Sequence, residues 1–410
     1  MVVINKSQVI LIHFNMNRLI IVGNGFDIAH RLKTKYGDFI KYYWSQIKDS
    51  SYADNFLGFH IPGYILDDCD GLKSTIDYFS SRNIDLKKKL NNPNYFNNGK
   101  LAITVKNEFF CRINERYDEA DWVDIEMEYY TNLKKILNRE PSQNVDEFEK
   151  ETYDKILKLN DDISIIANEF DKYLESQVLP EIDNCFNPRM KELFDNDEIF
   201  ENDLKHFFAE FPKNFIGKEL KQEFEKKKNE SGIVKKFDHT LVLNFNYTET
   251  IFHYLRPKMA SIIHIHGQVR NSTNPINLGF GDERDKFYPT IEDQNENEYL
   301  RFIKSFYYSN NNNYKEHFDF VEESSFQVQI MGHSCGLSDR TLLNAIFENR
   351  NCKSIKVFYH QYSSAKPNGQ TDNYSDIVRN ISRHFNQKTM MRDKIVNKTL
   401  SRDLPQLKIH

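Results

Sequence analysis

A serine flanked by two glycines stands late in the sequence, in residues 332–336 (G-H-S-C-G), directly after an apolar run. The pattern G-x-S-x-G after a strand is typical of the turn that exposes the nucleophile of serine hydrolases. Asp372 or Asp376, followed by His384, would supply the acid and the base in a matching order. However, only 76 residues follow Ser334, and no H-G-G-G oxyanion loop precedes it. The alternative is that this turn contacts a phosphate or a ribose.

Two histidines, His264 and His266, lie two residues apart at the end of another apolar run, just before Gly267. Side chains alternate along a strand with period two, so both would share one face. His266, at the strand end, is where a general base could reach a substrate. A metal site would need further ligands, and none stands out in the sequence. A packed, hydrogen-bonded side chain is the alternative, for His264 in particular.

A glycine-bearing turn, residues 23–27 (G-N-G-F-D), follows the apolar run Leu19–Val22 and precedes a helical segment. Glycines let a backbone approach a ligand closely, and the first amides of a helix favour an anion such as a pyrophosphate. The third glycine of the dinucleotide-binding fingerprint is missing, so a tight structural turn is an equal alternative. Asn246 follows a different apolar run and could hold a ribose hydroxyl or a water, or could cap a helix over residues 249–255.

These residues depend on short apolar runs to position them, most of which end in a polar or glycine-bearing turn. Such runs, followed by helices, predict an α/β fold with a Rossmann-like, mostly parallel sheet. Seven of the fifteen glycines fall at or soon after the ends of these runs. Because ligands bind at the carboxyl ends of strands in open α/β sheets, we expect the turns to converge on one crevice. The predicted strands are Leu19–Val22, Thr240–Leu243, Ser261–Ile265, Gln327–Met331 and Ser354–Phe358.

The organisation that follows is a core of residues 16–37 and 236–410, with a mainly helical insertion or second domain over 38–235. Apolar residues at three- and four-residue spacing predict helices over 121–137, 152–179 and 203–228, with Pro180 ending the second. The compact cluster of residues 121–126 (D-W-V-D-I-E) opens the first helix, where acidic residues are expected from the helix dipole alone. Residues 1–15 are either an N-terminal extension before an internal start at Met16 or an edge strand.

Composition excludes several classes of protein. The net charge of −5 disfavours a generic basic nucleic-acid-binding protein. The five cysteines form no C-x-x-C pair, so neither a disulfide scaffold nor a structural zinc site is supported. No apolar run approaches the roughly 18 residues that a membrane span needs. We therefore expect a cytoplasmic protein with no metal and no membrane partner.

Four segments, in order, resemble the AbiH family of bacteriophage abortive-infection proteins. They are residues 19–27 (L-I-I-V-G-N-G-F-D), 122–126 (W-V-D-I-E), 264–267 (H-I-H-G) and 331–334 (M-G-H-S). The likeness runs from about Met16 to about Tyr359. It implies a role in defence against phage, with a phage-derived trigger and a homo-oligomer as expected partners.

That family is in turn similar to the sirtuin-type NAD-binding fold. Residues 23–27 resemble the sirtuin G-A-G-I-S loop, Asn246 the asparagine of the Q-N-I-D motif, and His266 with Gly267 the H-G that carries the sirtuin base. Residues 332–334 resemble the glycine-serine turn that contacts NAD. The zinc-binding cysteine pairs of sirtuins are absent, so the resemblance implies hydrolysis of NAD rather than deacetylation of proteins.

The resemblance implies a site in which His266 is the base and Asn246 positions the ribose or a water. NAD or a related nucleotide would be substrate or ligand, with no further cofactor. The alternatives are a non-catalytic nucleotide sensor in phage defence and a serine hydrolase that uses Ser334. The residues expected to bind the nucleotide are Gly23, Asn24, Gly25, Phe26, Asp27, Gly332, His333 and Ser334.

Overall fold

A computed structural model provides the fold of most of the chain. The described residues are 16–47, 51–60, 95–97, 101–120, 124–140, 144–195, 198–200, 203–216, 221, 224–225, 233–255 and 260–408. The predicted extension or edge strand over 1–15 lies outside them, as do Asp121, Trp122 and Val123 of the acidic cluster. No helix in these ranges combines the length and apolarity that crossing a bilayer requires.

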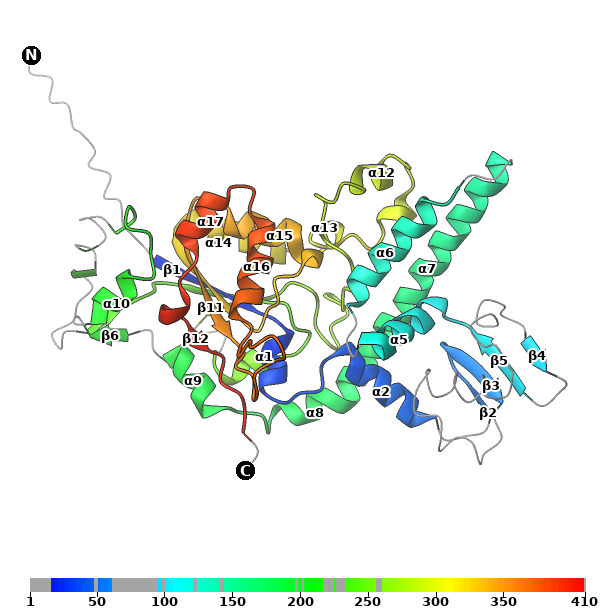
Figure 1. The fold of residues 1–410 in the computed structure, drawn as a ribbon, viewed down its shortest axis with the longest axis horizontal. Coiled ribbons are helices and arrows are strands. Elements are labelled where there is room, and N and C mark those ends of the chain that lie inside the picture. Colours follow the sequence, from blue (N-terminus) through cyan, green and yellow to red (C-terminus); the bar gives the residue numbers. More distant parts are fainter. Residues whose placement is uncertain are drawn as a thin grey trace, which may run out of the picture.

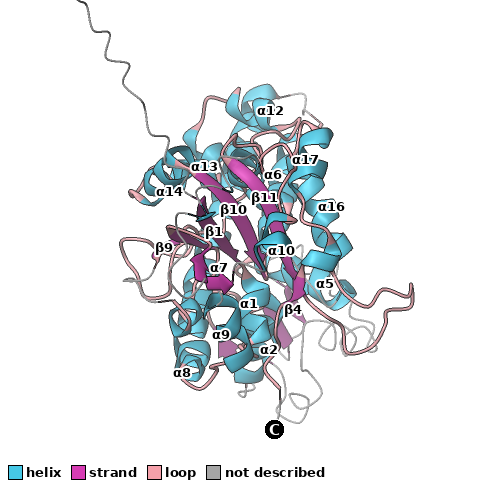
Figure 2. Ribbon diagram, turned by 90° about the vertical axis from the view of Figure 1, so that its left-hand side faces the viewer, coloured by secondary structure: helices cyan, strands magenta, loops and turns pink. Residues whose placement is uncertain are grey.

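A six-stranded sheet forms the centre of the protein, and every pairing within it is parallel (Figures 1 and 2). All five predicted strands belong to it, which confirms the α/β fold with a Rossmann-like parallel sheet. The sixth strand, the two-residue edge strand, was not predicted. In spatial order the strands are β12 (Arg402–Asp403), β11 (Cys352–Tyr359), β10 (Ser325–Met331), β1 (Met16–Val22), β8 (Thr240–Asn244) and β9 (Ser261–His264).

Helices cover both faces of the sheet. Because β1 is central and buried on both sides, its apolar run is continuous rather than alternating. Leu19 and Ile21 pack toward the helices that follow β9 and β10, whereas Ile20 and Val22 pack toward the opposite layer. The first layer contains α14 (Asn313–Glu323), α15 (Arg340–Phe347), α16 (Tyr374–His384) and α17 (Lys388–Lys394), and the second contains α1 (Asn24–Ala29), α9 (Pro188–Asp195) and the 3-10 turn η4 (Thr250–His253).

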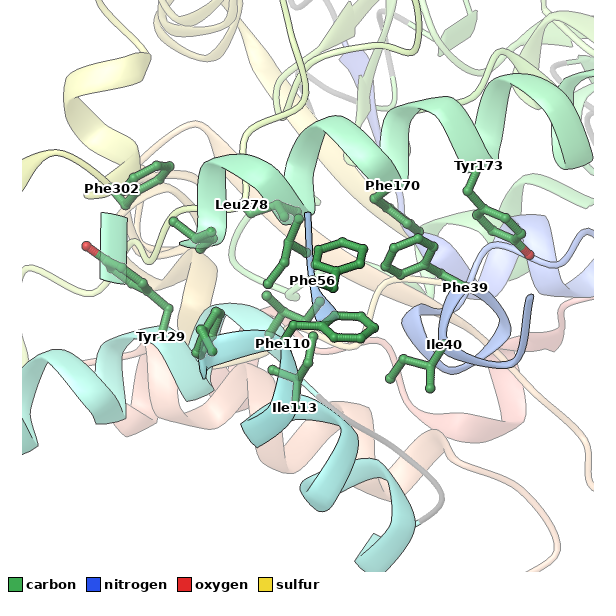
Figure 3. Close-up of a cluster of buried hydrophobic side chains, with 14 of the residues drawn as sticks. Phe39, Ile40, Phe56, Phe110, Ile113, Tyr129, Phe170, Tyr173, Leu278 and Phe302 are labelled. Atoms are coloured by element: carbon green, nitrogen blue, oxygen red, sulfur yellow. The ribbon is translucent and has the colours of Figure 1, made fainter. Parts of the chain in front are cut away.

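A second core lies beside the sheet and is built mainly from helices (Figures 1 and 3). It is rich in aromatic rings: Phe56 stacks on Phe110 with ring centroids 4.0 Å apart, and Phe39 meets Phe170 edge to face at 5.6 Å. Such pairs add to the stabilisation from burial. Its helices are α2 (Tyr36–Gln46), α5 (Glu108–Ala120), α6 (Ile125–Leu137) and α7 (Val145–Tyr173), the last continuing into the π-helix η2 (Leu174–Val178).

Two predicted helix ends need correction. Pro180 does not end a helix but lies in the first turn of α8 (Leu179–Ile182), where a missing amide hydrogen is tolerated. In the described part of 203–228, helix is confined to the 3-10 residue 203, α10 (Leu204–Phe208) and residues 221 and 224–225. Turns follow α10, and Pro212 disfavours helical geometry at the residue before it.

The remaining elements are short. A four-stranded antiparallel sheet in the order β2-β3-β5-β4 and a two-stranded sheet β6-β7 interrupt the helical insertion. The strands are β2 (Ser51–Ala53), β3 (Leu57–His60), β4 (Tyr95–Asn97), β5 (Leu101–Val105), β6 (Glu198–Phe200) and β7 (Ile233–Lys235). The last helical segments are α12 (Tyr288–Glu292), η5 (Asn297–Leu300), α13 (Lys304–Tyr307), η6 (Leu337–Asp339) and η7 (Lys398–Leu400).

Candidate functional site

A cleft of about 580 Å³ lies where the carboxyl ends of the central strands meet the insertion. This is the edge at which open α/β sheets bind ligands. Segments far apart in the chain form its walls, among them α1, α2, the start of α6 and the turn after β10. Leu404 and Gln406, just after β12, complete one side. The predicted residues that line the cleft are Asn24, Gly25, Asp27, Asn246, His266, Gly332, His333 and Ser334.

The two predicted glycine turns bind each other. Gly25 donates its amide hydrogen to Gly332 O at 2.8 Å, and Gly23 donates to Met331 O at 3.1 Å. A Cβ atom on Gly332 would come within 2.1 Å of Phe26 N, and its φ of +76° also favours glycine. These amides are therefore engaged within the protein, and the glycines bring two turns together. Phe26 is fully buried behind the cleft and does not line it.

His266 presents one ring nitrogen to Asp339 and leaves the other available. Its Nε2 lies 3.1 Å from Asp339 Oδ1, and its Nδ1 makes no hydrogen bond to any residue that the structure describes. Burial and, after it, the Lys304 ammonium lower the pKa of His266 to about 4, although Asp339 opposes both. The imidazole is therefore neutral at physiological pH and able to accept a proton from a group in the cleft.

Asp339 contacts one ammonium and two imidazoles through its two oxygens. Lys304, fully buried, donates to Asp339 Oδ1 at 2.8 Å, and His333 Nε2 lies 3.4 Å from Oδ2. Burial alone would raise the pKa of Asp339, but Lys304 and then His266 outweigh it and hold the pKa well below its usual range. The carboxylate stays charged and fixes the His266 ring in one orientation.

Lys304 also donates to Glu126 Oε2 at 2.8 Å, so one ammonium joins two carboxyls. Burial by itself would lower the pKa of Lys304, but the two carboxyls outweigh that effect and raise it. Glu126 belongs to the acidic cluster that the sequence explained by the helix dipole. Its neighbour Asp124 does cap α6, accepting a hydrogen bond from Met127 N at 3.0 Å. Glu126 instead lines the cleft.

Asp27 lies in α1 on another part of the same cleft, and its polar partners are uncharged. Thr248 Oγ1 donates to Asp27 Oδ2 at 2.6 Å, while Oδ1 accepts no hydrogen bond within the described part of the chain. Burial raises the pKa of Asp27 to about 6, although Thr248, Thr250 and Asn246 lower it. Asn246 does not cap a helix, because Glu249 occupies the cap position of η4.

The serine-hydrolase arrangement is not assembled among the described residues. His384 Nε2 lies 2.9 Å from the backbone oxygen of Cys335 rather than on the Ser334 hydroxyl. Asp372 pairs with Lys398, and Asp376 with Arg379. The helical segment after the turn begins only at Leu337, so the serine is not at a nucleophile elbow.

A metal site is likewise not seen in the parts of the chain that are described, where no group of three or more His, Cys, Asp or Glu side chains could hold an ion. His264 has its Nδ1 3.3 Å from Asn246 O, which fits the alternative of a packed, hydrogen-bonded histidine.

Sequence reasoning missed Lys304 and Asp339, which complete the polar wall of the cleft. Lys304 lies in a segment of aromatic and basic residues that contains no motif, and the position of Asp339 is typical of an acidic residue near a helix start. The only usable signal was the acidic cluster that contains Glu126, since clustered acids can mark a site as well as a helix end.

Comparison with known proteins identifies the family. The family model described as "Bacteriophage abortive infection AbiH" matches residues 19–361, which include β1 and most of β11. Neither a search of curated proteins nor one of solved structures returned a match, so the likeness to sirtuins stays a prediction. Since the match covers most of the sequence, this chain belongs to the AbiH family of bacteriophage abortive-infection proteins.

Proposed function

We propose that this abortive-infection protein defends the cell by hydrolysing NAD at the bond between nicotinamide and ribose. The observation that carries the proposal is an imidazole with one nitrogen fixed and one available. Asp339 holds Nε2 of His266, Nδ1 has no hydrogen-bond partner in the described chain, and Asn246 lines the same cleft. A base, its orienting carboxylate and a carboxamide in one cleft suit the addition of water to a sugar carbon.

In this reaction a water attacks C1′ of the ribose while the bond to the nicotinamide nitrogen breaks and its electron pair goes to the ring. His266 Nδ1 accepts the proton of the water, and the charge of Asp339 stabilises the imidazolium that forms. Asn246 orients the water or a ribose hydroxyl through its carboxamide. Asp27 Oδ1 accepts a hydrogen bond from another ribose hydroxyl, which satisfies a buried acceptor that otherwise has no partner.

The phosphates must find donors other than the amides of Gly23 and Gly25, which are engaged. Lys35, exposed at the start of α2, lines the cleft and carries the positive charge that a pyrophosphate requires. Asn24 and Ser334 line the cleft as well, and their side chains can donate hydrogen bonds to phosphate or ribose oxygens.

Cellular NAD after phage infection tests the proposal. Cells carrying the wild-type protein should lose NAD, whereas His266→Asn should slow nicotinamide release by about 10²–10⁴-fold, the usual contribution of a general base. His206→Asn, at an exposed position of α10, is the matched control and should behave as wild type. Protection from phage with unchanged NAD would refute the hydrolase, and NAD bound without being consumed would indicate the nucleotide sensor.

A further inference from the structure

A carboxyl, an ammonium and a second carboxyl form a continuous bridge in one wall of the cleft. Glu126 Oε2 and Asp339 Oδ1 each accept a hydrogen bond of 2.8 Å from Lys304 Nζ. The three residues come from α6, α13 and η6, so the bridge joins the insertion to the sheet domain. The proposed mechanism uses Asp339 behind His266 but gives Glu126 no role. A second carboxyl that lines the proposed active site and is paired with a buried ammonium requires an explanation.

Glu126 has one oxygen fixed and one available. Lys304 holds Oε2, while Oε1 makes no hydrogen bond to a residue of the described ranges, and the side chain lines the cleft. Because the lysine occupies Oε2, a proton on this carboxyl would be carried by Oε1, the oxygen available to a ligand.

Burial raises the pKa of Glu126 to about 8, with Lys304 opposing the rise and Asp339 and Asp124 adding to it. Glu126 is therefore protonated at neutral pH, while Asp339, on the other side of the same ammonium, is ionised. Titratable groups from several elements surround it: Lys304, Asp339, Asp124, and the hydroxyls of Tyr36 and Tyr247, which lie 3.3 Å apart.

Two carboxyls in one site, one protonated and one ionised, are the usual equipment for breaking a glycosidic bond. We propose that Glu126 is the general acid of this cleft, and that the cleft accepts nucleotides whose purine base departs only after it is protonated. This rests on the proposed hydrolysis at the same cleft and extends its substrate class. Nicotinamide leaves NAD as a neutral molecule without a proton, so NAD alone would not need the acid.

The step balances as a hydrolysis. The bond between C1′ and the purine nitrogen breaks, its electron pair goes to the base, and Glu126 Oε1 gives its proton to a ring nitrogen of the departing purine. Water bonds to C1′ and gives a proton to His266 Nδ1. Solvent then returns a proton to Glu126 and removes one from His266, so the net change is one water added.

Release of adenine from AMP, set against release of nicotinamide from NAD, tests the proposal on the full-length protein purified from infected and from uninfected cells. Glu126→Gln keeps the size of the side chain and an oxygen for Lys304 but has no acidic proton. The ratio of adenine release to nicotinamide release should fall at least about 100-fold, the lower range for a general acid. Glu128→Gln, on the same helix and paired with the half-exposed Arg116, should leave the ratio unchanged.

The outcomes separate this inference from the proposed function. Nicotinamide release without adenine release overturns the general acid and leaves NAD hydrolysis in place, as does an unchanged ratio in Glu126→Gln. Adenine release that depends on Glu126, without nicotinamide release, supports the inference and overturns NAD as substrate. Release of neither base overturns both. Infrared difference spectra add an independent measurement: the carbonyl band of a protonated carboxylic acid at pH 7 must be lost in Glu126→Gln, and its absence from the wild type also overturns the proposal.

Discussion

Two buried aspartates line the same cleft, yet their surroundings shift their pKa values in opposite directions. Asp339 meets a lysine and two histidines, and its pKa is held well below the usual range. Asp27 meets only hydroxyls and a carboxamide, and burial raises its pKa to about 6. Burial alone therefore does not decide the charge of a carboxyl: the cation Lys304, which Asp339 contacts and Asp27 does not, decides it here.

The contrast also separates two kinds of role. Asp339 has cationic or imidazole contacts on both oxygens, so it orients its neighbours and has no oxygen left for a ligand. Asp27 retains a buried oxygen for which the described chain supplies no hydrogen-bond partner, and the proposed contact with a ribose hydroxyl would supply one.

The largest change in the free energy of unfolding should come from removing Lys304, the cation that contacts Asp339 but not Asp27. Lys304→Met leaves the buried carboxylate of Asp339 and the partly buried carboxyl of Glu126 without their ammonium. Breaking a buried ion pair costs about 3–5 kcal/mol in the free energy of unfolding. Urea denaturation measures this loss. Lys315→Met, at an exposed position of α14, is the control and should stay within about 0.5 kcal/mol of wild type. Equal effects of the two substitutions would mean that Lys304 does not hold the site together.

Replacing each aspartate with asparagine should change the free energy of unfolding, and the two changes should depend on pH in opposite ways. Because the pKa of Asp27 rises from 3.8 to about 6 on folding, its contribution to stability is complete below pH 3.8 and is lost as the pH rises through 6. Asp27→Asn should therefore raise the free energy of unfolding at pH 8 by on the order of 2–3 kcal/mol and leave it unchanged near pH 3.5.

Asp339→Asn should do the reverse. The pKa of Asp339 falls on folding, so its contribution is present above pH 3.8 and is lost only on acidification. The variant should be less stable than wild type at pH 8, with the difference shrinking as the pH falls. Unfolding curves of both variants between pH 3.5 and 8 provide the measurement, and parallel pH dependences would contradict the comparison.

A smaller change in the free energy of unfolding should follow from removing the Thr248 hydroxyl, which donates a hydrogen bond to Asp27. Thr248→Val keeps the shape of the side chain but removes its hydrogen bond to Oδ2, which costs about 1–2 kcal/mol at neutral pH. The pKa of Asp27 should rise further, so the pH-dependent loss of stability moves to higher pH. Thr290→Val, at an exposed position of α12, is the control for the loss of a threonine hydroxyl. A downward shift of the midpoint would show that the hydroxyl does not favour the charged carboxyl.

The parts of the fold that could be predicted from the sequence are those encoded locally. The strands of the sheet are apolar runs bounded by turns, and β1 is apolar throughout because it is buried on both faces. The turns that bear Gly25, Asn246, His266 and Ser334 follow these strands, and their meeting at one edge is a property of parallel sheets. The prediction that these residues line one cleft was therefore within reach.

The polar bridge could not be predicted in this way. Lys304 lies 178 residues from Glu126 and 35 from Asp339 along the chain, so no local pattern connects the three. The role of the glycines could not be predicted either, because a glycine-bearing turn can lie close to a ligand or close to another turn. Here the turns of Gly25 and Gly332 pack against each other. Only the packing distinguishes the two cases.

The wall built by Leu404 and Gln406 has a consequence for how the protein is made. Leu404 donates its amide hydrogen to Tyr359 O at 2.7 Å, and Leu407 donates to Ala29 O at 2.8 Å, which brings this late segment onto α1. A nascent chain therefore cannot complete the cleft until residue 406 has left the ribosome. The order of translation therefore makes this wall the last part of the cleft to form.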